Sequence, residues 1–87
     1  MLNDSDKNIP FEELQKLLGE RVVFLRKEKG ILQKDLADMM EVDDSTVRRI
    51  EKGQLNLTLK TIDNLCKSLD ITLIELFSFK TTDKEII

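Results

Sequence analysis

The chain has 87 residues and a formal net charge of −3, with 40% apolar and 36% charged residues, one Pro, three Gly and neither Trp nor Tyr. This length allows one domain with a modest core, and the composition favours helices over strands. The sequence has no apolar run long enough to cross a membrane and no secretion signal at its start, so we expect a cytoplasmic protein. A lone Cys66 excludes an internal disulfide and predicts a buried apolar role for that side chain.

The first predicted helix spans residues 11–29 and follows a loose polar tail, residues 1–10. From Pro10 onward, apolar residues recur at intervals of three and four as far as Leu25, and Gly30 stops the helix. The stripe consists of Phe11, Leu14, Leu18, Val22 and Leu25. Gly19 inside this helix costs about 1 kcal/mol relative to Ala and marks a candidate bend.

Two short helices joined by a tight turn are predicted over residues 33–40 and 44–52. Their apolar or small residues fall where the two helices must touch, with a valine in the turn between them: Leu36, Ala37, Met40, Val42, Val47 and Ile50. Gly53 is expected to end the second helix in a left-handed conformation. We expect Asp43 or Asp44 to cap its start, with Asp43 preferred as a cap over a base-reading role.

Two further helices are predicted towards the end of the chain. Thr58 can cap the fourth, whose inward stripe consists of Leu59, Ile62, Leu65, Cys66 and Leu69. Thr72 can cap a short fifth helix that contains Leu73, Leu76 and Phe77. The fold class is therefore all-α, with five helices in one domain over residues 11–78. Residues 79–87 form a C-terminal tail that serves either in dimerisation or in a fold-back onto the first helix.

The helix over residues 44–52 carries the side chains of a helix that enters the DNA major groove. With about 100° per residue, Val47, Ile50 and Glu51 lie on an inward arc. The outward and flanking positions hold Ser45, Arg48, Arg49 and Lys52. Arginine can donate two parallel bonds to guanine, lysine and serine mostly bind phosphates, and Asp44 could accept a bond from cytosine. A solvated basic face is the alternative, and the preceding turn favours the DNA interpretation.

Two points beside this helix are predicted to bind phosphates. Gln33 begins one helix, where free backbone N–H groups and the amide side chain can bind an anion. Asn56 and Lys60 flank the start of another helix and offer a second point. Such contacts would fix the register of the base-reading helix on the duplex.

The charge distribution is compatible with these contacts. Residues 1–20 hold five acids and two bases, residues 61–87 hold five acids and three bases, and residues 21–60 hold nine bases and seven acids. Attraction to phosphates is screened over about 8 Å at physiological salt, so a local basic face can bind DNA on an acidic molecule. We expect non-specific binding to be weaker than that of a basic protein.

The combined motifs resemble the Cro/phage-repressor helix-turn-helix family, also called the Xre type. They read Leu18-Gly19-Glu20-Arg21-Val22, Leu25-Arg26, Lys29-Gly30, Gln33, Leu36-Ala37, Val47, Arg49-Ile50-Glu51-Lys52-Gly53 and Asn56. The resemblance covers residues 18–77 and implies a five-helix domain in which the third helix reads bases and two subunits bind a near-palindromic operator. It further implies base contacts at Asp44, Ser45 and Arg49, phosphate contacts at Gln33 and Asn56, and an ion pair between Arg26 and Glu51.

Three positions depart from the family pattern. Leu32 stands where a Ser or Thr usually caps a helix, Glu41 replaces the small or Gly residue of the turn, and Leu57 replaces a Pro. Leu32 implies a poorer cap, by about 0.5–2 kcal/mol. Glu41 must tolerate any left-handed backbone that the turn requires.

The sequence therefore predicts a dimeric transcription regulator that binds double-stranded DNA. The alternative is a protein-interaction module of the antitoxin or anti-repressor kind, which uses the same fold without strong DNA binding. No cofactor, metal or small-molecule substrate is expected, and we expect no enzymatic activity, because the chain lacks His, a phosphate-binding Gly loop and a nucleophile near a base. Val23, Phe24, Phe79, Ile86 and Ile87 are apolar residues that this domain does not need, and they favour a two-fold interface.

Overall fold

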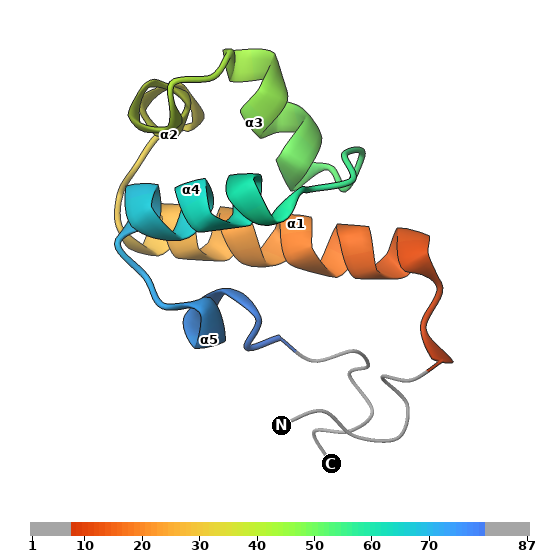
Figure 1. The fold of residues 1–87 in the computed structure, drawn as a ribbon. Coiled ribbons are helices and arrows are strands. Elements are labelled where there is room, and N and C mark those ends of the chain that lie inside the picture. Colours follow the sequence, from red (N-terminus) through yellow and green to blue (C-terminus); the bar gives the residue numbers. More distant parts are fainter. Residues whose placement is uncertain (1–7, 80–87) are drawn as a thin grey trace.

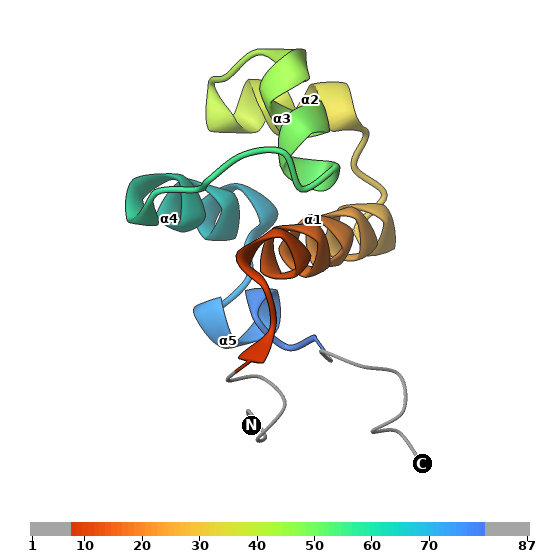
Figure 2. The same cartoon turned by 90° about the vertical axis from the view of Figure 1, so that its right-hand side faces the viewer.

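The computed structural model describes residues 8–79, and every regular element in that range is a helix. The five helices are α1 (Phe11–Glu28), α2 (Gln33–Met40), α3 (Asp44–Glu51), α4 (Leu59–Leu69) and α5 (Leu73–Leu76). In Figures 1 and 2, α2 and α3 lie on one side of the long α1, and α5 lies on the other. The expected all-α class with five helices is therefore confirmed. Within residues 8–79, none of the helices combines the length and the apolar character that a membrane crossing requires.

The helix ends follow the local signals in the sequence. α1 and α3 each end one residue earlier than predicted, and Gly30 and Gly53 then adopt positive φ angles of 70° and 73°. Thr58 accepts a hydrogen bond from the Thr61 N–H at 3.1 Å. At α5, Thr72 and Glu75 form a capping box, in which each side chain accepts a bond from the other residue's backbone N–H.

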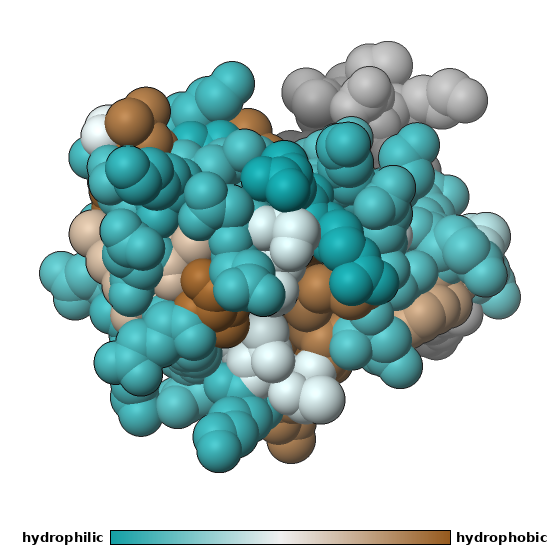
Figure 3. Space-filling model, turned by 90° about the horizontal axis from the view of Figure 1, so that it is seen from above, coloured by the Kyte–Doolittle hydropathy of each residue, from teal (hydrophilic) through white to brown (hydrophobic). Residues whose placement is uncertain are grey.

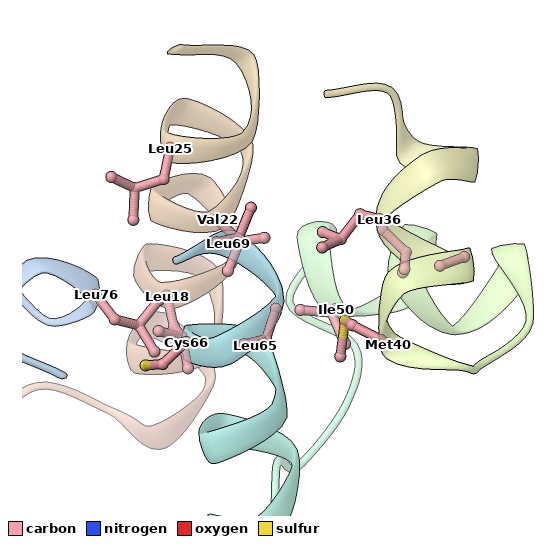
Figure 4. Close-up of a cluster of buried hydrophobic side chains, with 12 residues drawn as sticks. Leu18, Val22, Leu25, Leu36, Met40, Ile50, Leu65, Cys66, Leu69 and Leu76 are labelled. Atoms are coloured by element: carbon pink, nitrogen blue, oxygen red, sulfur yellow. The ribbon is translucent and has the colours of Figure 1, made fainter. Parts of the chain in front are cut away.

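The core lies where the inner faces of all five helices meet (Figure 4). Its buried members are Leu18, Val22, Leu25, Leu36, Ala37, Met40, Val47, Ile50, Leu65, Cys66, Leu69 and Leu76. Cys66 is buried as predicted, and burial, with a smaller contribution from the charge of Asp63, raises the pKa of its thiol. The thiol therefore serves as a small apolar side chain.

Several apolar side chains of the predicted stripes are not in this core. Phe11 and Leu14 are 50% and 37% exposed, because the first turns of α1 line an open cleft together with Leu57 and Phe77. Leu59 is 84% exposed at the first position of α4. Of the predicted tail, Phe79 packs against the core and against the Phe77 ring, and Ile86 and Ile87 lie outside the described residues.

Gly19 marks a close helix crossing, a role that the sequence did not predict. A Cβ atom at this position would lie 2.6 Å from the Ile50 carbonyl oxygen and 2.7 Å from that of Glu51. On the other side of the crossing, a Cβ at Gly53 would lie 2.8 Å from the Cα of Lys16. The two glycines let α1 and the end of α3 touch backbone to backbone.

Candidate nucleic-acid interface

The turn between α2 and α3 requires one left-handed residue, and that residue is Glu41 with φ 61°. The Val42 N–H donates to the Ala37 carbonyl at 3.0 Å, which closes the end of α2. Ala37 is fully buried, so the two helices approach closely at this point. The left-handed conformation anticipated for Glu41 is present, in a position where glycine would have no steric cost.

α3 divides cleanly into a buried and an exposed face. Val47 and Ile50 are buried against the core. The side chains of α3 and of the following Lys52 that the sequence assigned to DNA are all exposed: Asp44, Ser45, Arg48, Arg49 and Lys52. Within residues 8–79, none of these five side chains takes part in a hydrogen bond or ion pair. They are therefore available to a ligand, as the helical spacing predicted.

Asp43 occupies the cap position of α3, but its side chain makes no capping hydrogen bond. The prediction of a side-chain cap at Asp43 is therefore wrong. The Thr46 N–H, which such a cap could have satisfied, donates instead to the Asp43 backbone carbonyl at 2.9 Å. The carboxylates of Asp43 and Asp44 stay exposed at the helix start, where the helix dipole favours negative charge.

The end of α3 is fixed to α1 by the ion pair expected between Arg26 and Glu51. Arg26 Nε donates to Glu51 Oε2 at 2.6 Å and Arg26 Nη2 donates to Oε1 at 3.1 Å. The two side chains are only 9% and 4% exposed. Arg26 Nη1 also donates to the Ile31 carbonyl at 2.8 Å, so the buried guanidinium makes three hydrogen bonds.

Gln33 also contacts the Arg26–Glu51 pair, a role that the sequence did not predict. Its Nε2 donates to Glu51 Oε1 at 2.8 Å, which links the start of α2 to the end of α3. The side chain was predicted to bind a phosphate directly, but in the structure one of its two amide hydrogens is committed to Glu51. The backbone N–H groups at the start of α2 and the second amide hydrogen are left for an anion.

The second predicted phosphate contact lies at the start of α4. Asn56 and Lys60 are both exposed there, and Lys60 belongs to the first turn of the helix. The Thr58 hydroxyl is already used by the cap. Figure 3 shows the molecule from above, the side on which α2 and α3 lie in Figure 1, and most of this surface is hydrophilic. The arrangement presents one exposed basic helix flanked by two polar helix starts.

A family model described as helix-turn-helix matches residues 24–76, which include α2, the turn, α3, α4 and α5. The chain belongs to the helix-turn-helix family. The match includes every residue assigned above to DNA, and the resemblance noted in the sequence is thereby confirmed.

Several members of the helix-turn-helix family are similar to this chain. The control protein C.MunI from a Mycoplasma species is 38% identical over 61 residues, which are 69% of this chain and 82% of that protein. The crystal structure of the restriction-modification controller protein C.AhdI from Aeromonas hydrophila is 40% identical and superimposes with a TM-score of 0.70, covering 72% of this chain and 96% of that one.

A further structure contains DNA. It is the restriction-modification controller protein C.Esp1396I as a tetramer in complex with its natural 35 base-pair operator. That chain is 30% identical and superimposes with a TM-score of 0.68, covering 74% of this chain and 84% of its own. The helix-turn-helix fold of α2 and α3 is thus shared with a protein whose bound ligand is an operator duplex.

Proposed function

We propose that this chain is a transcription regulator that binds a near-palindromic operator in double-stranded DNA as a homodimer. The observation that carries the proposal is the exposed face of α3, on which Ser45, Arg48 and Arg49 have no side-chain partner among residues 8–79, while Val47 and Ile50 are buried on the opposite face. Such a helix can enter the major groove, where arginine distinguishes guanine by two parallel bonds. The similarity to controller proteins supports a role in transcription regulation, and we propose that the protein acts in the cytoplasm and has no enzymatic activity.

Phosphate contacts at the two helix starts fit the same mode of binding. The start of α2 at Gln33 and the start of α4 with Asn56 and Lys60 flank α3 along the chain. Contacts of this kind orient a protein on the duplex and carry no sequence information. Because the whole chain is acidic, we expect its non-specific binding to DNA to be weaker than that of a basic protein.

The proposal is tested by selecting bound sequences from random duplexes and then measuring affinity against salt. We expect one enriched, near-palindromic sequence, and an affinity that falls as salt rises because phosphate contacts release counterions. A duplex of equal length and scrambled sequence is the control. If no duplex shifts at low salt, the protein-interaction module becomes the better assignment.

Substitutions on α3 are expected to separate base contacts from phosphate contacts. Arg49→Ala and Ser45→Ala should weaken operator binding and relax the preference at one or two base pairs, by about 1–3 kcal/mol for a bidentate arginine contact. Lys52→Ala should weaken operator and scrambled duplex alike. The measurement is a binding titration on single-base operator variants, with folding checked by circular dichroism. Unchanged operator affinity in both Arg49→Ala and Arg48→Ala would contradict the assignment.

An apolar patch on α5 and α1 supports the homodimer. We call it the α5 patch; it consists of Phe24, Leu73, Ile74 and Phe77, which are 41–80% exposed. Arg21 brings the two helices together, since its Nε donates to the Glu75 carbonyl at 2.9 Å and its guanidinium lies 5.3 Å from the centroid of the Phe24 ring. α5 lies across α1 from α3 (Figure 1), so a partner bound to α5 leaves α3 free.

Ile74→Asp is expected to weaken the dimer without unfolding the monomer, because Ile74 is 80% exposed and a charge there stays hydrated until a partner covers it. Sedimentation equilibrium should show a shift from dimer to monomer. The operator should lose more affinity than a half-site, since a dimer contacts two half-sites about 10 base pairs apart. Lys34→Asp, an exposed substitution on α2 away from the α5 patch, is the control for the oligomeric state. A wild-type chain that stays monomeric at tens of micromolar and prefers no palindrome would rule out the dimer.

A further inference from the structure

The carbonyl group of Met40, the last residue of α2, is bound by a side chain from another helix. The last four carbonyls of a helix lack partners within the helix, and the turn satisfies only some of them, as Val42 does for Ala37. Asn64 on α4 donates from Nδ2 to the Met40 carbonyl at 2.9 Å. This hydrogen bond joins α4 to the turn immediately before α3.

The amide of Asn64 is itself fixed in orientation. The Ser68 hydroxyl, one turn further along α4, donates to Asn64 Oδ1 at 3.1 Å. Both side chains are half-buried. With its oxygen occupied by Ser68, the Asn64 amide directs its NH₂ group at Met40.

The turn matters because it determines where the first residues of α3 lie. The far end of α3 is fixed to α1 by the close crossing at Gly19 and by the pair of Arg26 with Glu51. The near end, which carries Asp44 and Ser45, follows directly from the turn. A shift of the turn would therefore move Asp44 and Ser45 while the other end of α3 stays in place.

We propose that Asn64 is a positioning residue for sequence recognition, which acts by fixing the Met40 carbonyl and, through it, the first residues of α3. The inference rests on the proposed function, because it assumes that α3 binds DNA. Asn64 itself lies on α4 and acts only through the turn. Its loss should reduce discrimination between operator and other DNA more than it reduces binding to phosphates, since base contacts depend on position and phosphate attraction does so less.

Three substitutions on α4 test this. Asn64→Asp keeps the size of the side chain and an oxygen for Ser68, but replaces the donor with an oxygen that faces the Met40 carbonyl. Ser68→Ala removes only the group that orients the amide. Asp63→Asn is the matched control, because it replaces a carboxylate with an amide at the neighbouring position, the reverse of Asn64→Asp. Asp63 is exposed, and so is Lys67, its ion-pair partner.

The first measurement needs no DNA. Backbone amide exchange at residues 41–46, followed by NMR, should accelerate in Asn64→Asp relative to residues 59–69, and should be unchanged in Asp63→Asn. Unchanged exchange at residues 41–46 would overturn the link between Asn64 and the turn. This readout needs no DNA binding, so a wild-type chain that prefers no duplex would contradict the proposed function while the link between Asn64 and the turn could still be measured.

The second measurement is the ratio of the affinities for the selected operator and for a scrambled duplex, in which a change in overall charge largely cancels. We expect the ratio to fall about threefold to tenfold in Asn64→Asp, the effect of one typical hydrogen bond, and less in Ser68→Ala. Equal losses on both duplexes, or no loss in either variant, would overturn the proposal. If Asn64→Asp does not fold, Ser68→Ala decides: a ratio equal to that of the wild type counts against positioning.

Discussion

Replacing Glu51 with Ala is expected to lower the free energy of unfolding by about 3–5 kcal/mol. The substitution leaves Arg26 buried at 7% exposure without the carboxylate that neutralises it, and Gln33 also loses its acceptor. Urea unfolding followed by circular dichroism measures the change. Because the pair fixes the end of α3, operator binding should fall together with stability.

Lys67→Ala provides the matched control for this substitution. It also removes one partner of an ion pair, but Lys67 and Asp63 are 77% and 60% exposed. Exposed pairs contribute about 0–1 kcal/mol, so we expect a small change. Similar losses in the two variants would mean that burial of the Arg26–Glu51 pair does not determine its contribution.

Gly19→Ala is expected to destabilise the fold by about 2–3 kcal/mol, although alanine is the better helix former by about 1 kcal/mol. The new Cβ would lie within 3 Å of the backbone of Ile50 and Glu51, so α1 and α3 would have to separate. Thermal and urea unfolding measure the loss of stability, and a titration with the operator shows whether α3 has moved.

The control for Gly19→Ala is Glu20→Ala, the next residue on α1, whose side chain is exposed. A surface substitution of this kind changes stability by less than about 0.5 kcal/mol. If Gly19→Ala proved more stable than the wild type, helix propensity would outweigh the close crossing, and the contact between α1 and α3 would have to be looser than described.

Local signals in the sequence account for most of the helix bounds. Thr58 and Thr72 cap helices as predicted, and the spacing of Val47 and Ile50 placed the buried face of α3 correctly. These features depend on residues within one turn of each other, so periodicity and capping rules reach them. The pairing of Arg26 with Glu51 was anticipated by the inward position of Glu51 and by the family resemblance.

Contacts between segments far apart in the chain were harder to predict from the sequence. Gly19 was interpreted as a bend, because its neighbours in α1 give no sign that the backbone of α3 crosses there. The position of Gln33 at a helix start predicts a phosphate contact but not its hydrogen bond to Glu51, and no pattern around Asn64 predicts its hydrogen bond to Met40. Each of these roles depends on a tertiary partner at least 18 positions away, which no local pattern encodes.

The close crossing at Gly19 also has a consequence for how fast the protein can bind. With one end of α3 fixed backbone to backbone on α1, this helix is ordered before it meets any ligand. A preorganised surface does not have to lose chain entropy when the complex forms. Association should then be governed by diffusion and orientation, as for a rigid body, and differences in affinity between related duplexes should appear mainly as differences in residence time.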